Sequence, residues 1–400
     1  MISMEKIRDA ASVLQGVAYR TTMIHAKKMS TPQTELYLKA ENLQLTGSFK
    51  LRGAYYKISK LSEEEKKNGI IACSAGNHAQ GVALAAQRRG IPCVICMPEG
   101  SPLSKVEATR SYGAEVCLVK GVYDDAAARA VELQQRYGYT FIHPFNDEDV
   151  IAGQGTVGLE IAEQLPEADV VLVPIGGGGL AGGVAYAIKH LLPHCKVYGV
   201  QAAGAAGMYQ SLKDHKIETL PSVSTLADGI AVKTPGSLTF ELAQNYLDGV
   251  VTVSEDELAQ AILALAEKQK LVTEGAGAAT VAAALFQKVD LEGKKVVCIL
   301  SGGNIDVSIF SRIINRALLI SGRNCSITML LRDQPGAIER VSNVIGAEGA
   351  NILSIRHNRD DVNVPVNCCV TTFKLETRDR SHVQRIRDAL KEAGFELTEE

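Results

Sequence analysis

The sequence predicts an α/β protein with two doubly wound parallel-sheet subdomains and a smaller C-terminal α+β domain. Two observations support this prediction. Short, continuously apolar runs alternate with longer stretches of helical period from about residue 70 to about residue 253, and charged residues become denser after about residue 322. Apolar runs without polar alternation are typical of parallel strands covered on both faces. Ligand sites in such sheets lie in the crevice at the carboxyl ends of the strands.

The elements of the first 320 residues follow from this alternation. The predicted strands are short runs that are apolar and mostly rich in β-branched residues, and they span residues 36–38, 70–73, 93–97, 116–119, 170–175, 197–200, 250–253 and 296–300. The predicted helices between them span residues 51–61, 77–89, 101–112, 123–137 and 180–192. We expect one domain over residues 1–322, in which a small subdomain of about residues 51–145 is inserted.

Residues 325–400 form the second expected domain. Of these 76 residues 22 are charged, which is a denser fraction than the 22% of the whole chain. The pattern indicates strands at 326–331, 352–356, 364–375 and 395–397, with helices at 337–346 and 381–393. This βαββαβ order predicts a compact α+β module.

Composition excludes several classes of protein. A net charge of -3 argues against a general nucleic-acid binder. Charged residues among the first fifteen argue against a signal peptide, and six glycines and a proline within the uncharged run 170–188 argue against a membrane span. Nine cysteines in such a chain indicate a reducing, cytoplasmic compartment. Cys93 and Cys96 have CxxC spacing, but their apolar surroundings predict a buried strand rather than a zinc site.

The lysine in Gly47-Ser48-Phe49-Lys50 is the first candidate for chemistry. Lys50 stands directly before the predicted helix 51–61, between apolar Phe49 and Leu51. A desolvated lysine is a nucleophile, and it can hold an aldehyde cofactor as a Schiff base. For the tetrapeptide alone the alternative is a solvated lysine at a helix start.

Four consecutive glycines, Gly176, Gly177, Gly178 and Gly179, lie between the predicted strand 170–175 and the predicted helix 180–192. Successive glycine amides at a helix N-terminus bind phosphate. The run matches neither a Walker loop nor the dinucleotide fingerprint, since no Gly-Lys-Ser/Thr ends it. A crowded structural turn is the alternative, and the presence of Lys50 favours phosphate.

Two further motifs place polar side chains after predicted strands. In Ser301-Gly302-Gly303-Asn304, the Ser301 hydroxyl is a neutral donor for a pyridine nitrogen, with a helix cap as the alternative. In Ser74-Ala75-Gly76-Asn77-His78, the Asn77 amide is suited to a ring hydroxyl, and Ser74 with neighbouring amides is suited to a substrate carboxylate. An ordinary N-cap is the alternative for Asn77. We assign no proton transfer to His78.

Together these motifs predict pyridoxal 5′-phosphate, which needs an amine, a phosphate cradle and partners for its ring nitrogen and hydroxyl. From about residue 5 to residue 320 their type and order resemble the serine/threonine dehydratases (threonine ammonia-lyases), fold type II pyridoxal enzymes with a tryptophan synthase β-like fold. The resemblance implies that Lys50 is the Schiff-base lysine. It implies cofactor contacts by Phe49, Asn77, Gly176, Gly177, Gly178, Gly179, Leu180, Gly229, Glu274 and Ser301, and substrate contacts by Ser74, Ala75, Gly76, Asn77 and His78.

Two departures from related serine racemases refine this expectation. Those racemases carry a second serine, the acid/base of the opposite face, where this chain has Ala75, so the resemblance implies poor racemisation. They also bind a divalent cation through acidic residues that follow the strand matching 197–200. Residues 201–207 contain no carboxylate here, so we expect no metal at that place.

The C-terminal pattern resembles an ACT-type regulatory domain with a ferredoxin-like fold. Its Pro335-Gly336 turn enters the first helix, and Gly349-Ala350-Asn351-Ile352 follows that helix with residues that tolerate left-handed backbone. The resemblance implies an amino-acid effector such as isoleucine or valine, and a homo-oligomer, either dimer or tetramer. A module that only pairs subunits is the alternative.

The resemblance implies β-elimination of L-threonine to 2-oxobutanoate and ammonia, as in isoleucine biosynthesis or in catabolism, with some conversion of L-serine to pyruvate. A methyl group discriminates by only about 1–3 kcal/mol, so both substrates are expected to react. The alternatives are a serine dehydratase or racemase, a β-replacement synthase of the same fold, and a regulator that has kept an inactive cofactor site.

Overall fold

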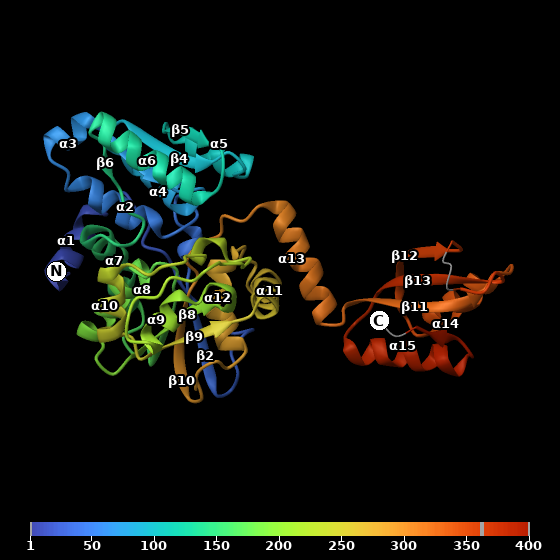
Figure 1. Ribbon diagram of the computed structural model, residues 1–400. Helices are drawn as coiled ribbons and strands as arrows, with labels where there is room; N and C mark the ends of the chain where they lie inside the picture. Colours follow the sequence, from blue (N-terminus) through green and yellow to red (C-terminus); the bar gives the residue numbers. More distant parts are fainter. Residues whose placement is uncertain (1, 361–363, 399–400) are drawn as a thin grey trace. The chain divides into compact units, whose positions relative to one another are not determined.

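A computed structural model describes residues 2–360 and 364–398 of the chain (Figure 1). It forms two compact units, Met1–Phe310 and Ser311–Glu400. The first unit contains two sheets and the second contains one. The α/β prediction with a C-terminal α+β module is confirmed. The predicted boundaries at residues 322 and 325, and those of the inserted subdomain, stay predictions.

The large sheet of the first unit has six strands in the order β1-β2-β10-β7-β8-β9. They are β1 (Met23–His25), β2 (Thr34–Lys39), β10 (Lys294–Ile299), β7 (Val170–Pro174), β8 (Lys196–Ala202) and β9 (Gly249–Val253). All neighbours are parallel except β1, which pairs with β2 in the antiparallel sense and which the sequence did not predict. The sheet is therefore mixed at one edge rather than purely parallel.

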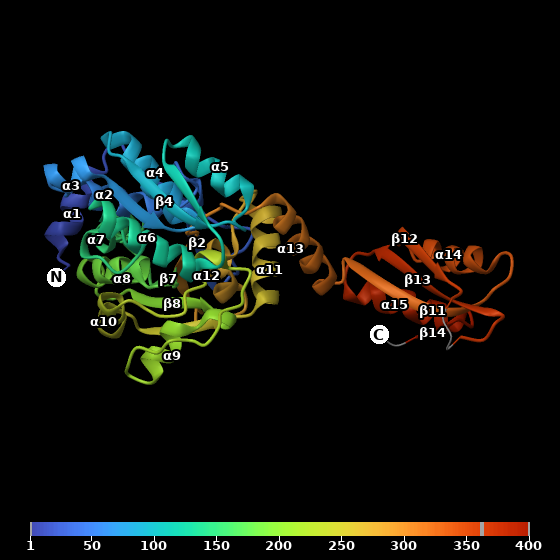
Figure 2. The ribbon, with the colours of Figure 1, turned by 45° about the horizontal axis from the view of Figure 1, so that its top comes forward.

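The small sheet has four parallel strands in the order β5-β4-β3-β6, and it is coloured light blue to blue-green in Figures 1 and 2. Its strands are β5 (Glu115–Val119), β4 (Cys93–Pro98), β3 (Ile70–Cys73) and the unpredicted β6 (Thr140–Phe141). The adjacent helices are α2 (Lys50–Ser59), α3 (Glu63–Asn68), α4 (Asn77–Arg89), α5 (Leu103–Ser111) and α6 (Tyr123–Tyr137). The predictions for α4 and α6 are confirmed at both ends.

The remaining helices of the first unit pack around the large sheet. They are α1 (Met4–Val13), α7 (Glu148–Gln164), α8 (Gly179–Leu191), α9 (Gly207–Lys213), α10 (Ser237–Tyr246), α11 (Glu255–Ala264) and α12 (Gly275–Leu285). Short helical turns occur at η1 (Glu41–Leu43), η2 (Ala203–Ala205), η3 (Asp228–Ile230) and η4 (Leu265–Gln269). Helix α7, whose Asp147 cap accepts hydrogen bonds from two backbone amides, packs against both α8 and α2. It thereby connects the helices of the two sheets.

Strand geometry explains the CxxC pair. Side chains alternate across a sheet with a period of two, so residues three positions apart point to opposite faces. Cys93 accordingly joins the core on one face of the small sheet, and Cys96 joins the core on the other face. The prediction that this spacing belongs to a buried strand is confirmed.

The second unit contains a four-stranded antiparallel sheet in the order β12-β13-β11-β14. Its elements are β11 (Asn324–Arg332), α14 (Ala337–Ala347), β12 (Asn351–Asn358), β13 (Cys368–Glu376), α15 (Arg380–Glu392) and β14 (Glu396–Leu397). The predicted βαββαβ order is confirmed. The predicted strand start at residue 364 was wrong, because residues 364–367, which include Pro365, form a bend and turn and pairing with β11 begins at Cys368. Residues 361–363 lie outside the described part.

Helix α13 (Val307–Ile320) connects the sequences of the two units. In the described part of the chain, no helix combines the length and apolar character that crossing a membrane requires.

Candidate active site

The predicted site residues lie at the carboxyl ends of parallel strands from both sheets. Asn77 follows β3, the four glycines follow β7, and Ser301 follows β10. Glu274 precedes α12, and Lys50 is the first residue of α2. The two doubly wound sheets therefore present loop and helix starts to one crevice, which is where such folds bind ligands.

Lys50 is partly buried, and its Nζ donates a hydrogen bond to the Pro144 carbonyl oxygen at 2.8 Å. The same nitrogen lies 5.3 Å from the ring centroid of Phe49, which is 9% exposed. Burial lowers the pKa of Lys50 to about 8, and the nearby Glu274 opposes this shift. The apolar surroundings predicted for this lysine are thus present on the side of Phe49. A pKa of about 8 means that part of the amine is deprotonated near neutral pH.

The glycine loop starts α8 and packs against Phe145. Gly178 has a φ of 100°, and a Cβ on Gly177 or Gly179 would lie 2.3 Å or 3.0 Å from Phe145 atoms. Crowding thus explains part of the need for glycine here, which agrees with the alternative of a crowded structural turn. The first-turn amides of α8 are still free of helical partners, because an α-helix leaves its first N–H groups unpaired. Gly176 lies beside Ile230, and Leu180 is buried.

Ser301 is 2% exposed and is tied to the lysine segment through the backbone. The Phe49 amide donates to the Ser301 carbonyl at 3.1 Å, and the Gly303 amide donates to the Gly47 carbonyl at 2.9 Å. Ser48 and Gly302 form an isolated antiparallel bridge between these two bonds. Residues 252 to 256 positions apart in the sequence are therefore held together directly before Lys50.

Three polar side chains form a directed chain of hydrogen bonds. Asn304 Nδ2 donates to Asn77 Oδ1 at 2.8 Å and to the Thr46 carbonyl at 2.7 Å. Asn77 Nδ2 donates in turn to Glu274 Oε1 at 2.6 Å. The donor from Asn304 fixes which end of the Asn77 amide is oxygen, so the Asn77 NH2 group is turned toward Glu274.

Glu274 is 3% exposed, and the hydrogen bond described above joins it to an amide group rather than to a cation. Burial and, to a smaller extent, the charge of Asp228 together raise the pKa of Glu274 to about 8. Glu274 therefore carries its proton at neutral pH. Glycines make room for it: a Cβ on Gly302 or Gly229 would lie 2.5 Å or 3.0 Å from Glu274 Oε1.

The segment 74–78 opens α4. Ser74 Oγ accepts a hydrogen bond from the Gly76 amide at 3.2 Å, and a Cβ on Gly76 would meet open space. Ala75 is partly buried and offers no side-chain proton. The His78 ring points away to the Ile142 carbonyl at 2.8 Å, and burial lowers its pKa to about 3. Any ligand contact of His78 is therefore left to its backbone.

This arrangement fits pyridoxal phosphate on two counts. The unpaired amides at the start of α8 can bind the phosphate group, and a buried amine with a lowered pKa can react with the aldehyde group. A model of the pyridoxal-phosphate-dependent enzyme family matches residues 14–302. The chain belongs to this family. A model of the ACT domain matches residues 322–393, so the C-terminal unit is an ACT domain.

Named relatives match between 78% and 99% of this chain. The L-threonine ammonia-lyase of Thermotoga maritima is 50% identical over 398 residues, covering 99% of both chains. The catabolic L-threonine dehydratase of Escherichia coli (strain K12) is 47% identical over 78% of this chain and 96% of its own. Among solved structures, threonine deaminase isoform 2 from Solanum lycopersicum is 39% identical with a TM-score of 0.75, over 78% and 87% of the two chains. Maize serine racemase is 35% identical with a TM-score of 0.74, over 79% and 98%.

Sequence reasoning missed two parts of the candidate site. Asn304 was quoted within its motif but was given no role, and the loop that carries Pro144 and Phe145 was not considered. A run of His143-Pro-Phe-Asn146 after a short strand was the available signal. His143 Nδ1 accepts from the backbone amides of Phe145 and Asn146, so this histidine shapes the loop.

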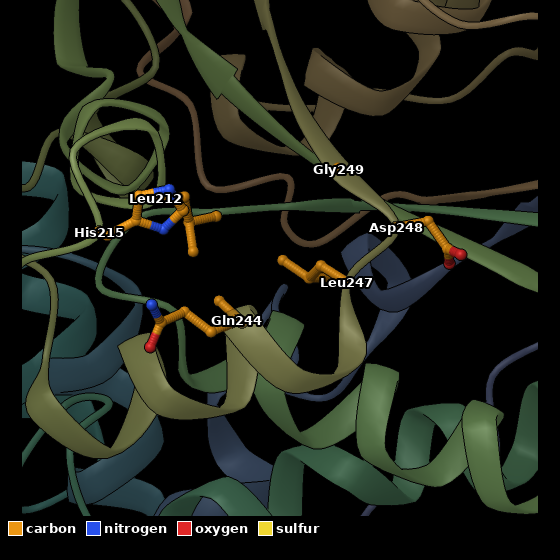
Figure 3. Close-up of a pocket in the computed structure, with 7 residues that line it drawn as sticks. Leu212, His215, Gln244, Leu247, Asp248 and Gly249 are labelled. Carbon is orange, nitrogen blue, oxygen red and sulfur yellow. The ribbon is translucent and has the colours of Figure 1, made fainter.

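A separate hollow of about 260 Å³ lies where α10 ends and β9 begins (Figure 3). Leu212, His215, Gln244, Leu247, Asp248 and Gly249 line it, and none of them belongs to the pyridoxal site. Asp248 is already engaged with Lys189 at 2.6 Å and with the Val197 amide at 2.7 Å. The Asp248 carboxylate thus serves the scaffold of the large sheet.

Proposed function

We propose that this enzyme is a threonine ammonia-lyase that converts L-threonine to 2-oxobutanoate and ammonia. The observation that carries the proposal is the 50% identity, over 99% of both chains, with an enzyme named L-threonine ammonia-lyase. The geometry supports an amino-acid substrate. The Lys50 amine, with its lowered pKa, lies in the crevice, and the space beside Gly76 at the start of α4 is open. Conversion of L-serine to pyruvate is part of the proposal, since one methyl group discriminates weakly.

In this proposal each side chain has a distinct task. Bound at Lys50, pyridoxal phosphate supplies an electron sink that makes the α-proton of an amino acid acidic. The amino group of the substrate would replace Lys50 on the cofactor, and the released Lys50 amine would then accept the α-proton, a role that its lowered pKa supports near neutral pH. The amides at the start of α4, around Ser74 and Gly76, receive the substrate carboxylate. Ser301 holds the ring nitrogen, and the amides of Gly176–Leu180 hold the phosphate.

The hydrogen-bond chain through Asn77 orients the donor to the ring hydroxyl. Asn304 holds the Asn77 oxygen, so the Asn77 NH2 group has one hydrogen on Glu274 and a second one for the cofactor. Protonated Glu274 leaves this region without a negative charge beside the ring. Asn304 is therefore a positioning residue in this proposal, and Phe49, Gly229 and Glu274 line the cofactor.

A direct assay separates this function from its alternatives. The purified holoenzyme is mixed with L-threonine alone, the visible spectrum is followed, and 2-oxobutanoate is measured. Keto acid together with a spectral change supports the ammonia-lyase. A spectral change without keto acid supports a β-replacement synthase, which needs a second substrate. No change with any amino acid supports a regulator with an inactive site.

Racemisation is the alternative suggested by the similarity to maize serine racemase. Ala75 stands where related racemases place their second acid/base serine, and its methyl group has no proton to give. Incubation with L-serine is expected to give pyruvate without accumulation of D-serine, as measured by chiral chromatography. Accumulation of D-serine at a rate similar to that of pyruvate would favour the racemase.

We further propose that the ACT domain binds an amino-acid effector and that the enzyme is a cytoplasmic homo-oligomer. Gly349, with a φ of 77°, lies two residues before β12, and its left-handed backbone lets the chain turn from α14 into that strand. Nine free cysteines suit a reducing compartment. Titration with isoleucine and valine, with activity as the readout, tests the effector and distinguishes a biosynthetic from a catabolic role. Light scattering distinguishes dimer from tetramer.

A further inference from the structure

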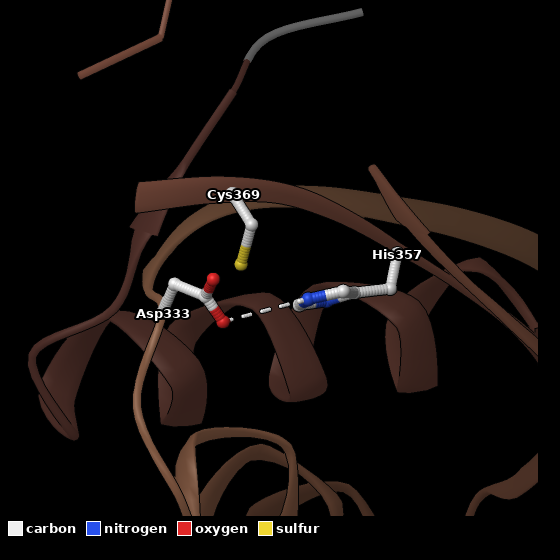
Figure 4. Close-up of side chains that lie close together, drawn as sticks. All are labelled: Asp333, His357 and Cys369. Carbon is white, nitrogen blue, oxygen red and sulfur yellow. Dashed lines mark ion pairs between the residues drawn. The ribbon is translucent and has the colours of Figure 1, made fainter. Parts of the chain in front are cut away.

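Three side chains that suit a metal ion converge within the ACT domain (Figure 4). Asp333 lies in the turn between β11 and α14, His357 lies near the end of β12, and Cys369 lies near the start of β13. One ligand atom from each residue lies within 4.8 Å of the other two. In the described ranges this is the one group of three or more such residues that meets this distance.

Cys369 points into this group from a fully buried position. It is 0% exposed, its Sγ donates a hydrogen bond to the Leu331 carbonyl at 3.4 Å, and the same sulfur lies 3.7 Å from Thr371 Oγ1. The neighbouring Cys368 points to the other face of β13, where its Sγ lies 3.7 Å from Asn367 Oδ1. Alternation along the strand therefore selects one cysteine of the adjacent pair and leaves the other as an internal comparison.

His357 is oriented by a buried hydroxyl. Its Nδ1 lies 3.0 Å from Oγ1 of Thr371, which is 0% exposed, and its Nε2 lies 3.9 Å from Asp333 Oδ1. When Nδ1–H donates to Thr371, the lone pair is on Nε2 and faces the carboxylate. Metal-binding histidines are typically held in this way through their other nitrogen.

Asp333 is held as a carboxylate by Arg359. Arg359 Nε donates to Oδ2 at 2.6 Å and Nη2 donates to Oδ1 at 3.0 Å, and this pair lowers the pKa of Asp333. Each carboxylate oxygen has two lone pairs, so Oδ1 can bind an ion while Oδ2 stays on Arg359. A ligating carboxylate is commonly hydrogen-bonded by such an outer partner.

We propose that Asp333, His357 and Cys369 form a binding site for one zinc-class divalent ion. Carboxylate oxygen, imidazole nitrogen and thiolate are the ligands that Zn²⁺ accepts, whereas Mg²⁺ and Ca²⁺ prefer oxygen alone. Binding replaces the S–H bond of Cys369 with an S–Zn bond and releases the proton to water. Zinc bonds of about 2.0–2.3 Å require the side chains to close by roughly 1 Å, and a fourth position stays open for water.

The site would connect three segments of one domain. It would join the turn before α14 to β12 and to β13, so an ion bound only by the folded domain stabilises that fold. The proposal depends neither on pyridoxal phosphate nor on threonine chemistry, because none of its residues belongs to the pyridoxal site.

The test uses the full-length holoenzyme after dialysis against a chelator. Equilibrium dialysis with ZnCl₂ is expected to give one tightly bound zinc per chain, and titration with CoCl₂ is expected to give thiolate charge-transfer and tetrahedral ligand-field absorption. Cys369→Ser and His357→Gln are expected to weaken zinc binding by about tenfold or more. Cys369→Ser is also expected to abolish the charge-transfer band.

Cys368→Ser is the matched control, because it removes the adjacent thiol from the same strand and is expected to change neither measurement. Circular dichroism without metal checks that each variant folds, and His357→Gln keeps the test valid where the buried Cys369→Ser does not fold. Absence of stoichiometric zinc at micromolar free ion would overturn the proposal. Equal loss in Cys368→Ser and Cys369→Ser would also overturn it.

Discussion

Two buried polar regions meet at helix α2, and they differ in how their charges are balanced. Arg52, two residues after Lys50, donates to both oxygens of Glu41 at 2.8 Å and 2.7 Å, and to Glu160 at 2.5 Å. Lys39 completes this cluster with a 2.5 Å bond to Glu160. In the pyridoxal site, Lys50 contacts a carbonyl oxygen and Glu274 contacts an amide.

The pKa values express this difference. Burial opposes ionisation in both regions, but in the cluster the ion pairs prevail, so the pKa of Arg52 is raised and that of Glu41 is lowered. In the pyridoxal site burial prevails, so the pKa of Lys50 falls and the pKa of Glu274 rises, each to about 8. The paired charges of the first region give it a structural role. The second region is suited to proton transfer, because its groups have no ion-pair partner among the described residues and their pKa values lie near neutral pH.

The largest expected effect is on activity, through Lys50. Lys50→Ala removes the amine that holds the cofactor and accepts the α-proton, so the rate of 2-oxobutanoate formation is expected to fall by about 10³-fold or more. Its unfolding free energy is expected to stay close to that of the wild type. Lys60→Ala, at the other end of the same helix, is the control and is expected to keep full activity. Normal turnover by Lys50→Ala would remove the proposed role.

The cluster of Arg52, Glu41, Glu160 and Lys39 is expected to affect stability, in contrast to Lys50. Arg52→Met removes the cation that bonds the buried Glu41 and leaves Glu160 with Lys39 alone, so the unfolding free energy is expected to fall by about 3–5 kcal/mol in urea denaturation. The exposed Arg20–Glu163 pair provides the control, since Arg20→Met is expected to cost less than about 1 kcal/mol. Equal costs for the two variants would show that the cluster contributes no more than a surface pair.

Glu274 gives a pH test on the cofactor-free enzyme. Its folded pKa of about 8 lies above the ordinary pKa of 4.5 for a glutamate, so its contribution to stability is fully present below pH 4.5 and is lost as pH rises through 8. Glu274→Gln does not titrate. The unfolding free energy of the wild type minus that of Glu274→Gln is therefore expected to decrease by on the order of 3 kcal/mol between pH 5 and pH 8. A difference independent of pH would contradict the protonated Glu274.

The smallest expected effect concerns Asn304. Asn304→Ala frees the Asn77 amide to rotate, so affinity for pyridoxal phosphate is expected to fall by about tenfold, the value of roughly one hydrogen bond. Cofactor titration followed by absorbance measures it, and the absorbance maximum of the bound form is expected to shift. Asn146→Ala, in the neighbouring loop, is the comparison, because it bonds Ser237 and the Leu238 amide instead. An unchanged affinity and spectrum in Asn304→Ala would exclude the positioning role.

Local pattern alone was sufficient for much of this protein. Apolar runs and helical periods predicted α4 and α6 at both ends, the parallel sheets and the βαββαβ order of the ACT domain, because burial and backbone geometry act over a few residues. The motifs around Lys50, Asn77, Gly176–Gly179 and Ser301 predicted the cofactor, because each combines a residue type with a strand end. The edge strand β1 was missed because its three residues carry too little periodicity.

Only the tertiary structure decided which groups act on one another. The sequence gives no sign that Asn304 holds Asn77, that Pro144 receives Lys50, or that burial protonates Glu274, since these depend on loops from different strands meeting in one crevice. The same holds for Asp333, His357 and Cys369, whose proximity follows from a turn and from strand register. Desolvation and hydrogen-bond geometry depend on distances in space, and separation along the chain does not determine those distances.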